Sequence, residues 1–511
     1  MEVVRNALSH WPDYIRLEEA VKNQAVPAAV TGVSEIHKSC LLAALRKSTG
    51  RRLLLVAGDE GEAQRFQEDL FSLGLRPVFY PLRDFCFRDT TGVSHEYERL
   101  RLEALSQLQS GRCDCVIACI DAALQYTIPP KELEKRLFPV EAGAALEMDA
   151  LVKALVQCGY TREDQIEGPG QFSRRGGIVD FYSPGASAPV RVEFWGDEID
   201  SLSYFDLDSQ RRTEPVDAVM LAPCVEVIPE NPIILAQKIE KLASSLRGKT
   251  APKAKEILRG EGEKLKNGLH IGSLDKFLPL VYGETATLFD YFPRETSLLV
   301  FSEGNKLKER MRTSLWQWGE DLKSFLAEGV LCKGLDHYSE DWEYALGRAQ
   351  HAPTLFLDLF ARGAYEIPTR TLVNVNVKQL PVWAGGTQLL ADDLRPLLDL
   401  GRACVVLCGT PRAGIALAED LKAMGLPAGY LETVSTAAPG TVTVTPGTLS
   451  AGFELPEANF ALLSHGRMAA VKQKKRKRDK NSKEISSLSE LSPGDYVVHA
   501  THGIGLFEGI H

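Results

Sequence analysis

The sequence lacks three features that would each indicate a particular class of protein: an excess of basic charge, a long apolar run and paired metal-binding cysteines. Lysine and arginine number 59 against 68 aspartates and glutamates, and the formal net charge is −9. This acidic balance argues against a surface that binds DNA over its whole extent. The ten cysteines form no C-x-x-C pair, and apolar runs such as CDCVIACI at 113–120 indicate small buried side chains in a reducing compartment.

No stretch is long and uncharged enough to span a bilayer, and the first twenty residues carry charges instead of an apolar signal core. We therefore expect a cytoplasmic protein with no membrane partner. The 511 residues exceed what one hydrophobic core normally organises, so three or four domains are expected.

Strands and helices alternate over the first part of the chain. Apolar strand-like runs lie at 28–31, 52–57, 77–82 and 114–120, and helical patterns separate them. Strands that are buried on both faces and joined by helices predict a parallel, doubly wound α/β sheet.

The pattern changes between about residues 140 and 223, where short strands alternate apolar and polar residues between Pro, Gly and Asp turns. This alternation predicts a separate antiparallel meander. Beyond it the sequence predicts helices at 231–268, a strand at 297–302 and a further strand–helix module from about 379 to 465.

A charged run, VKQKKRKRDKNSKEISS, follows that module. Its dense part, 472–480, has the charge to bind nucleic acid, but no aromatic residue interleaves it, which favours a solvated tether between domains. Residues 491–511 supply two strands at most, and two strands make no stable barrel. We therefore expect the chain to be a fragment.

Residues Gly32 to Ser39 (GVSEIHKS) follow a predicted strand and open a helix, as the phosphate-binding loop G-x-x-x-x-G-K-[ST] does. That loop needs its second glycine, because the backbone approaches the phosphates closely there. His37 occupies the glycine position, whereas Lys38 and Ser39 are retained. We expect a degenerate loop, with an active nucleotide site as the open alternative.

The second half of a nucleotide site also departs from its pattern. It requires an apolar strand that ends in an aspartate, which helps to hold magnesium. The best candidate strand, 298–301, ends in Ser302 and Glu303. Because a serine lacks the charge that holds a hard cation, we expect neither ATP hydrolysis nor a metal or cofactor in this chain.

In the meander, the segment VRVEFW (190–195) places Arg191, Glu193 and Trp195 on one face. A tryptophan beside an arginine is typical of a protein-binding hot spot. The same pattern also fits a tryptophan lying flat over a neighbouring strand beside a solvated arginine, and the residues alone leave both interpretations open. The arginine pair 174–175 adds basic groups near the same sheet.

Two long segments resemble one protein family. GPGQFSRRGGIVDFYSPGASAPVRVEFWGDEIDSLSYFDLDSQRR (168–212) is similar to the UvrA-binding module shared by the damage-recognition protein UvrB and the transcription-repair coupling factors (Mfd). LSPGDYVVHATHGIGLFEGI (491–510) resembles the opening of an RNA-polymerase-interacting module that the coupling factors have and UvrB lacks.

The resemblance implies a domain division. Residues 1–130 and 225–378 would form a UvrB-like, degenerate P-loop ATPase fold, with the UvrA-binding meander inserted at 131–224. A small α/β domain at 379–467, a basic linker at 468–490 and the start of a CarD-like polymerase-interacting module at 491–511 would follow.

The resemblance also implies a function. The family's UvrA-contacting residues correspond by motif to Arg175, Arg191 and Trp195, so the chain would be a platform that recruits UvrA for transcription-coupled nucleotide excision repair. ATP, Mg²⁺, DNA and the RNA polymerase β subunit would belong to the full-length parent, which releases stalled polymerase by ATP-driven translocation. The alternatives are an active P-loop hydrolase and a UvrB-type damaged-DNA binder, and the chain lacks their intact loop and aromatic-rich hairpin.

Overall fold

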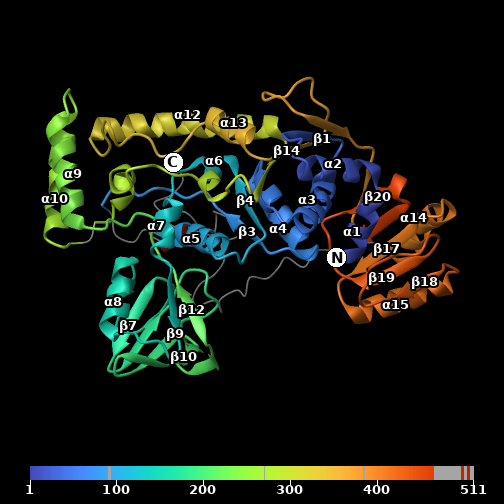
Figure 1. The fold of residues 1–511 in the computed structure, drawn as a ribbon, viewed down its shortest axis with the longest axis horizontal. Coiled ribbons are helices and arrows are strands. Elements are labelled where there is room, and N and C mark those ends of the chain that lie inside the picture. The colour runs from blue at the N-terminus through green and yellow to red at the C-terminus, as the bar shows by residue number, and fades with distance from the viewer. Residues whose placement is uncertain (90–93, 270, 384–385, 465–495, 500–502, 507–511) are drawn as a thin grey trace.

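The computed structural model describes residues 1–89, 94–269, 271–383, 386–464, 496–499 and 503–506. Its described part contains several separate sheets, so the prediction of a multidomain α/β protein is confirmed (Figure 1). The predicted basic linker at 468–490 lies outside the described residues.

A central sheet of seven parallel strands organises the largest unit. Its strands are β1 (Ala28–Thr31), β2 (Arg52–Ala57), β3 (Pro77–Tyr80), β4 (Cys115–Cys119), β13 (Ser297–Ser302), β14 (Thr354–Asp358) and β15 (Thr371–Asn374). Their order across the sheet is β15-β1-β14-β13-β2-β4-β3, with every neighbouring pair parallel. Two segments far apart in sequence, which carry β1–β4 and β13–β15, therefore build one sheet.

Most of these strands are apolar runs buried along their whole length, so helices cover both faces of the sheet. One face packs against α1 (Glu2–Ser9), α2 (Pro12–Lys22), α3 (Glu35–Thr49) and α4 (Glu60–Ser72). The other packs against α5 (Glu96–Gln109), α6 (Ile120–Leu124), α12 (Gly304–Glu328) and α13 (Trp342–His351).

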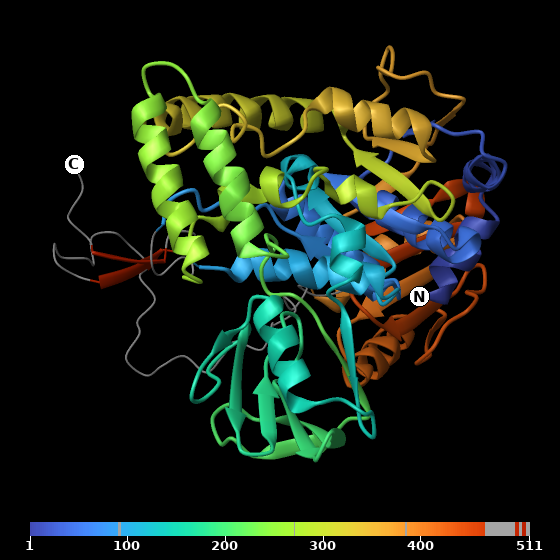
Figure 2. The ribbon, with the colours of Figure 1, turned by 60° about the vertical axis from the view of Figure 1, so that its left-hand side comes forward.

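A largely antiparallel unit, in which the edge pair β6–β7 is parallel, is inserted in the sequence between the two halves of the central sheet. It forms a separate lobe beneath that sheet (Figure 2). Its main sheet has the order β11-β10-β9-β8-β7-β6. The strands are β6 (Thr161–Arg162), β7 (Gln171–Arg175), β8 (Ile178–Phe181), β9 (Val190–Trp195), β10 (Glu198–Phe205) and β11 (Arg212–Pro215). Helix α8 (Met148–Gln157) shares the core of this unit with the apolar side of the sheet.

The entry and exit of the inserted unit lie side by side. Strands β5 (Phe138–Glu141) and β12 (Ala218–Leu221) pair antiparallel, and Phe138 is opposite Leu221. Beyond the exit, α9 (Pro232–Ser245) and α10 (Ala251–Lys266) confirm the helices predicted at 231–268. They form a helical hairpin that packs against the C-terminal part of α12.

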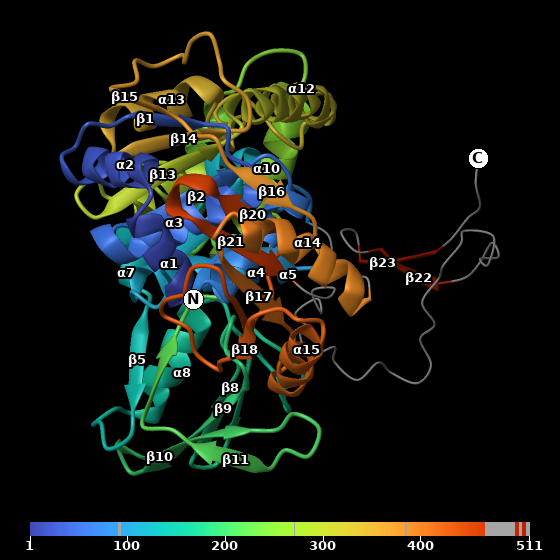
Figure 3. The ribbon, with the colours of Figure 1, turned by 90° about the vertical axis from the view of Figure 1, so that its right-hand side faces the viewer.

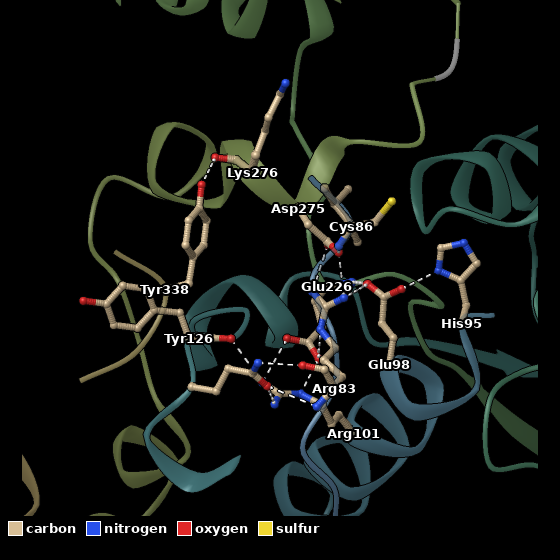
Figure 4. Close-up of polar contacts among 12 residues, drawn as sticks. Arg83, Cys86, His95, Glu98, Arg101, Tyr126, Glu226, Asp275, Lys276 and Tyr338 are labelled. Atoms are coloured by element: carbon tan, nitrogen blue, oxygen red, sulfur yellow. Dashed lines mark hydrogen bonds and ion pairs between the residues drawn. The ribbon is translucent and has the colours of Figure 1, made fainter. Parts of the chain in front are cut away.

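A buried ionic network joins the exit of the inserted unit to the central domain (Figure 4). Glu226 accepts a hydrogen bond from Arg101 of α5 with an Nε–Oε1 distance of 2.6 Å, and both side chains are fully buried. Arg83, which follows β3, forms two hydrogen bonds with Asp275 at 3.0 and 2.9 Å. The Glu226 backbone N–H donates to Glu98 at 2.7 Å. Breaking such a network by removing one charged partner is strongly destabilising.

The third unit has a six-stranded sheet of order β16-β20-β21-β17-β19-β18. The strands are β16 (Lys378–Leu380), β17 (Ala403–Cys408), β18 (Ala428–Tyr430), β19 (Val442–Pro446), β20 (Gly452–Leu455) and β21 (Phe460–Ser464). One face packs against α14 (Thr387–Asp399) and α15 (Pro411–Ala423), and the other shares a core with α1–α3 (Figure 3).

Strands β22 (Tyr496–His499) and β23 (Gly503–Leu506) pair antiparallel and are the described part of 491–511. Nine of the ten cysteines are free thiols, and all nine are buried. Among the described helices, none combines the length and apolar character needed to cross a membrane.

Candidate functional sites: a degenerate nucleotide loop and an open sheet face

The predicted phosphate loop lies between β1 and α3, and the surrounding chain occupies it. Gly32 has a φ of +86°, and a Cβ added there would lie 2.3 Å from the carbonyl oxygen of Val375. The Gly32 N–H donates to the Leu359 carbonyl at 3.2 Å, and the Val33 N–H donates to the Asp358 carbonyl at 3.3 Å. Backbone donors that would wrap a phosphate are therefore used within the protein.

Lys38 is buried, and its ammonium group has two internal partners. It donates to Ser302 Oγ at 3.0 Å and to Glu303 Oε1 at 2.5 Å. Glu303 Oε1 also accepts the Leu359 N–H at 2.8 Å. The structure thus brings Lys38, Ser302 and Glu303 together, and a carboxylate stands beside the lysine where phosphate oxygens would stand in an active loop.

Two further charged residues, Glu62 and Lys306, pair with each other beside the contact of Lys38 with Ser302 and Glu303. Ser302 Oγ donates to Glu62 Oε1 at 2.5 Å, and Glu62 Oε2 accepts the Gly58 N–H at 2.8 Å and pairs with Lys306 at 3.6 Å. A cavity of about 450 Å³ remains beside these residues, and Ser450 of the third unit forms part of its wall.

His37 packs between the central domain and the third unit. Its Nδ1 lies 2.8 Å from Ser34 Oγ, and its ring meets the Phe453 ring of β20 edge-on at 5.7 Å. Burial lowers the pKa of His37 to about 4, so the ring is neutral at physiological pH. Ser39 is fully buried, and its hydroxyl has no hydrogen-bond partner among the described residues. His37, which occupies the position of the second glycine of an active loop, is therefore part of the interface between the central domain and the third unit.

A carboxylate that sequence reasoning missed lies at the end of β14, next to β1. Asp358 is buried, and it accepts hydrogen bonds from Arg362 Nη2 at 2.6 Å and from the Tyr365 hydroxyl at 2.8 Å. Burial raises the pKa of Asp358. The detectable signal was the apolar run TLFLD, which ends in an acid. Within the described ranges, no group of three or more His, Cys, Asp or Glu residues is arranged to hold a metal ion.

The second candidate site is the open face of the inserted sheet, which we define as Arg175, Asp180, Arg191, Glu193 and Trp195. Successive residues of a strand point to opposite faces, and the buried valines of β9 alternate with Arg191, Glu193 and Trp195. The side chain of Trp195 is 83% exposed. The interpretation of a tryptophan lying flat over a neighbouring strand is therefore wrong.

Arg191 is largely buried, which corrects the interpretation of a solvated arginine. Its side chain is 13% exposed, and its Nε and Nη2 donate to the two carboxylate oxygens of Asp180 at 2.8 Å each. Its Nη1 donates to the Gln210 carbonyl at 3.2 Å, and its guanidinium lies 4.7 Å from the centre of the Phe205 ring. Pairing with Asp180 raises the pKa of Arg191.

Arg175 reaches the same carboxylate from β7. Its Nη2 donates to Asp180 Oδ2 at 3.0 Å, and its side chain remains 50% exposed. Arg174 points to the opposite face and pairs with Asp149 of α8 at 2.6 Å. The structure therefore brings Arg175 and Arg191 together, whereas Trp195 stands roughly 13 Å further along β9 on the same face.

Two family models match the chain. The model described as "UvrB interaction domain" covers residues 138–226, and the model described as "CarD-like/TRCF RID domain" covers residues 491–511. The first match begins at the start of β5 and ends at Glu226 of the buried network, so it coincides with the inserted unit. Fold and match together define a multidomain α/β protein that carries a UvrB interaction domain.

Similar proteins cover almost the whole chain. The transcription-repair-coupling factor of Bacillus subtilis is 30% identical over 507 residues, which are 97% of this chain and 42% of that protein. Those of Staphylococcus epidermidis and Staphylococcus aureus are 26% and 25% identical, over 99% and 94% of this chain and 44% and 42% of their own lengths. The chain is therefore similar to transcription-repair-coupling factors over almost its whole length, and it spans about two fifths of the length of these relatives.

Proposed function

We propose that this chain recruits UvrA during transcription-coupled nucleotide excision repair, through the open face of its inserted unit. The observation that carries the proposal is the arrangement of Arg175 and Arg191 on one buried carboxylate, on the same face as a tryptophan that is 83% exposed. Arginine and tryptophan anchors dominate the binding energy of many protein interfaces. The match to a UvrB interaction domain over 138–226 supports the same unit.

We also propose that this chain does not hydrolyse ATP. Hydrolysis would require Lys38 to leave Glu303 and the backbone donors of Gly32 and Val33 to leave the carbonyls that they now contact. A UvrB-like, degenerate P-loop fold for 1–130 and 225–378 is supported by the single sheet that both segments build. ATP-driven translocation, DNA contact and release of stalled RNA polymerase are proposed for the whole protein, with residues 491–511 contributing to contact with the polymerase β subunit.

Titration of UvrA onto the chain tests the proposal. Trp195→Ala should weaken binding by about 30-fold to 1,000-fold, because truncating a central aromatic anchor typically costs ~2–4 kcal/mol. Trp316→Ala on α12 is the matched control and should leave the affinity unchanged. Trp316 is 65% exposed, and α12 lies on the other side of the central domain from the inserted sheet (Figure 1). Equal affinity of the wild type and the Trp195→Ala, Arg175→Ala and Arg191→Ala variants would place the UvrA contact elsewhere.

A further inference from the structure

Asp180 of β8 carries a buried charge on the open face of the inserted sheet. It is 1% exposed, and in the sheet register it lies between Ser173 of β7 and Arg191 of β9. Its carboxylate accepts three hydrogen bonds from arginine side chains: two from Arg191 and one from Arg175. One acid therefore holds both arginines of the proposed UvrA site.

Within the described part of the chain, these contacts leave a defined set of arginine N–H donors free for a partner. A guanidinium carries five N–H groups in a fixed plane. Arg191 uses three of them, on Asp180 and the Gln210 carbonyl, so one N–H remains on each terminal nitrogen. Arg175 uses one, and its half-exposed side chain keeps the others. Two donor groups at a fixed spacing suit a carboxylate, which arginine binds in a planar, bidentate manner.

We propose that Asp180 is a positioning residue for the UvrA site, which orients Arg175 and Arg191 so that their remaining donors meet a carboxylate of the partner. This inference rests on the proposed UvrA-binding function. Long arginine side chains lose conformational freedom when they bind, and groups already held in the bound geometry lose less. The stacking of Arg191 on Phe205 fixes the plane of the guanidinium further.

A competing effect has the opposite sign. If the face acted only as a patch of positive charge, Asp180 would weaken binding to an acidic partner by neutralising the arginines. Removing its charge would then strengthen the complex. The direction of the affinity change therefore separates positioning from bulk charge.

The experiment measures UvrA affinity of the full chain by titration calorimetry, with Asp180→Asn and Asp149→Asn as a matched pair. Both variants remove the charge of an aspartate that pairs with an arginine of β7, but Asp149 pairs with Arg174 on the opposite face of the sheet. We expect Asp180→Asn to weaken UvrA binding about tenfold and Asp149→Asn to change it less than twofold. Unchanged or tighter binding by a folded Asp180→Asn variant would overturn the inference.

Arg191→Lys keeps the charge but cannot form the paired contact with Asp180, so it tests the inference even if Asp180→Asn fails to fold. We expect it to weaken binding about tenfold as well, and a lysine variant with wild-type affinity would overturn the inference. If Asp180 acts through Arg191, adding Asp180→Asn to Arg191→Lys should cause little further loss, whereas independent tenfold losses would contradict that route. Absence of binding by the wild-type chain would instead reject the proposed function itself.

Discussion

Arg191 and Trp195 share a strand face, yet the folding free energy should depend on them very differently. Arg191 is 13% exposed and compensates the buried charge of Asp180, whereas Trp195 is 83% exposed. Removing one partner of a buried ion pair leaves an uncompensated charge. We therefore expect Arg191→Ala to lower the unfolding free energy by about 2–3 kcal/mol, and Trp195→Ala to lower it by less than about 0.5 kcal/mol.

Urea unfolding of both variants checks this prediction, with Arg174→Ala as a control. Arg174 pairs with Asp149, which is itself exposed, so its removal should have little effect. A large loss of stability in Trp195→Ala would mean that this side chain packs within the unit and is not an anchor for a partner.

The same residues show what a sequence can and cannot predict about the site. Alternation along β9 was enough to place Arg191 and Trp195 on one face. It could not identify Asp180 as the shared partner, because that contact depends on the register of β8 against β9, which alternation does not specify. The burial of Arg191 follows from Asp180 and was missed for the same reason.

Helix α3 carries a pH-sensitive contact at the interface with the third unit. Burial against Phe453 lowers the pKa of His37 to about 4, below its ordinary value of 6.5. The unfolded chain then binds a proton below pH 6.5 that the folded chain does not bind until about pH 4. The unfolding free energy should therefore fall as the pH drops from 6.5 towards 4. Between pH 7 and pH 5, His37 should account for a loss of about 2 kcal/mol.

Unfolding of His37→Gln beside the wild type at pH 7 and pH 5 measures this contribution. Asp69, which accepts two hydrogen bonds from Ser450, acts in the opposite direction, because burial raises its pKa to about 6 and favours its protonated form. Its contribution is present at low pH and is lost as the pH rises from about 4 to 6. It is common to both proteins, so the difference between them isolates His37. Equal pH dependence would mean that His37 has the same pKa in the folded and the unfolded chain.

The elements around the predicted phosphate loop also predict the response to nucleotide. Because Glu303 holds Lys38 and Val375 lies against Gly32, we expect millimolar Mg-ATP to leave the melting temperature unchanged. A ligand present at 100 times its Kd would add about 2.7 kcal/mol to the stability. A melting shift that disappears in Lys38→Ala but persists in Lys47→Ala, an exposed lysine of the same helix, would contradict this expectation.

The sequence predicted the two halves of this loop site from local motifs, and the structure brings Lys38 and Ser302 to 3.0 Å. It did not reveal that β14 lies between β1 and β13, or that its final residue, Asp358, joins the site. Strand order in a parallel sheet is set by the packing of distant segments, and no local pattern in TLFLD specifies its neighbours.

At the scale of the whole molecule, the inserted unit is a separate lobe, and the chain enters and leaves it through two neighbouring strands, β5 and β12. Its hydrophobic core is separate from those of the central sheet, and its entry and exit pair in adjacent strands with Phe138 opposite Leu221. Residues paired across antiparallel strands have Cα atoms roughly 4.5–5.5 Å apart. A short linker can therefore join residues 137 and 222 without straining either part.

Replacing 138–221 with two to four Gly and Ser residues should leave the central domain and third unit folded, because Glu226 and its contact with Arg101 are retained. This variant should show a cooperative melt and lose UvrA capture.

The separate segment 138–226 should capture UvrA with an affinity within about threefold of the full chain, since the open face and its core lie within it. UvrA capture by the shortened chain would move the binding site off the insertion. A folded segment that fails to bind would mean that the site extends onto α5, where Arg99 and Glu103 contact the loops of the inserted unit at Gly170 and Gly185.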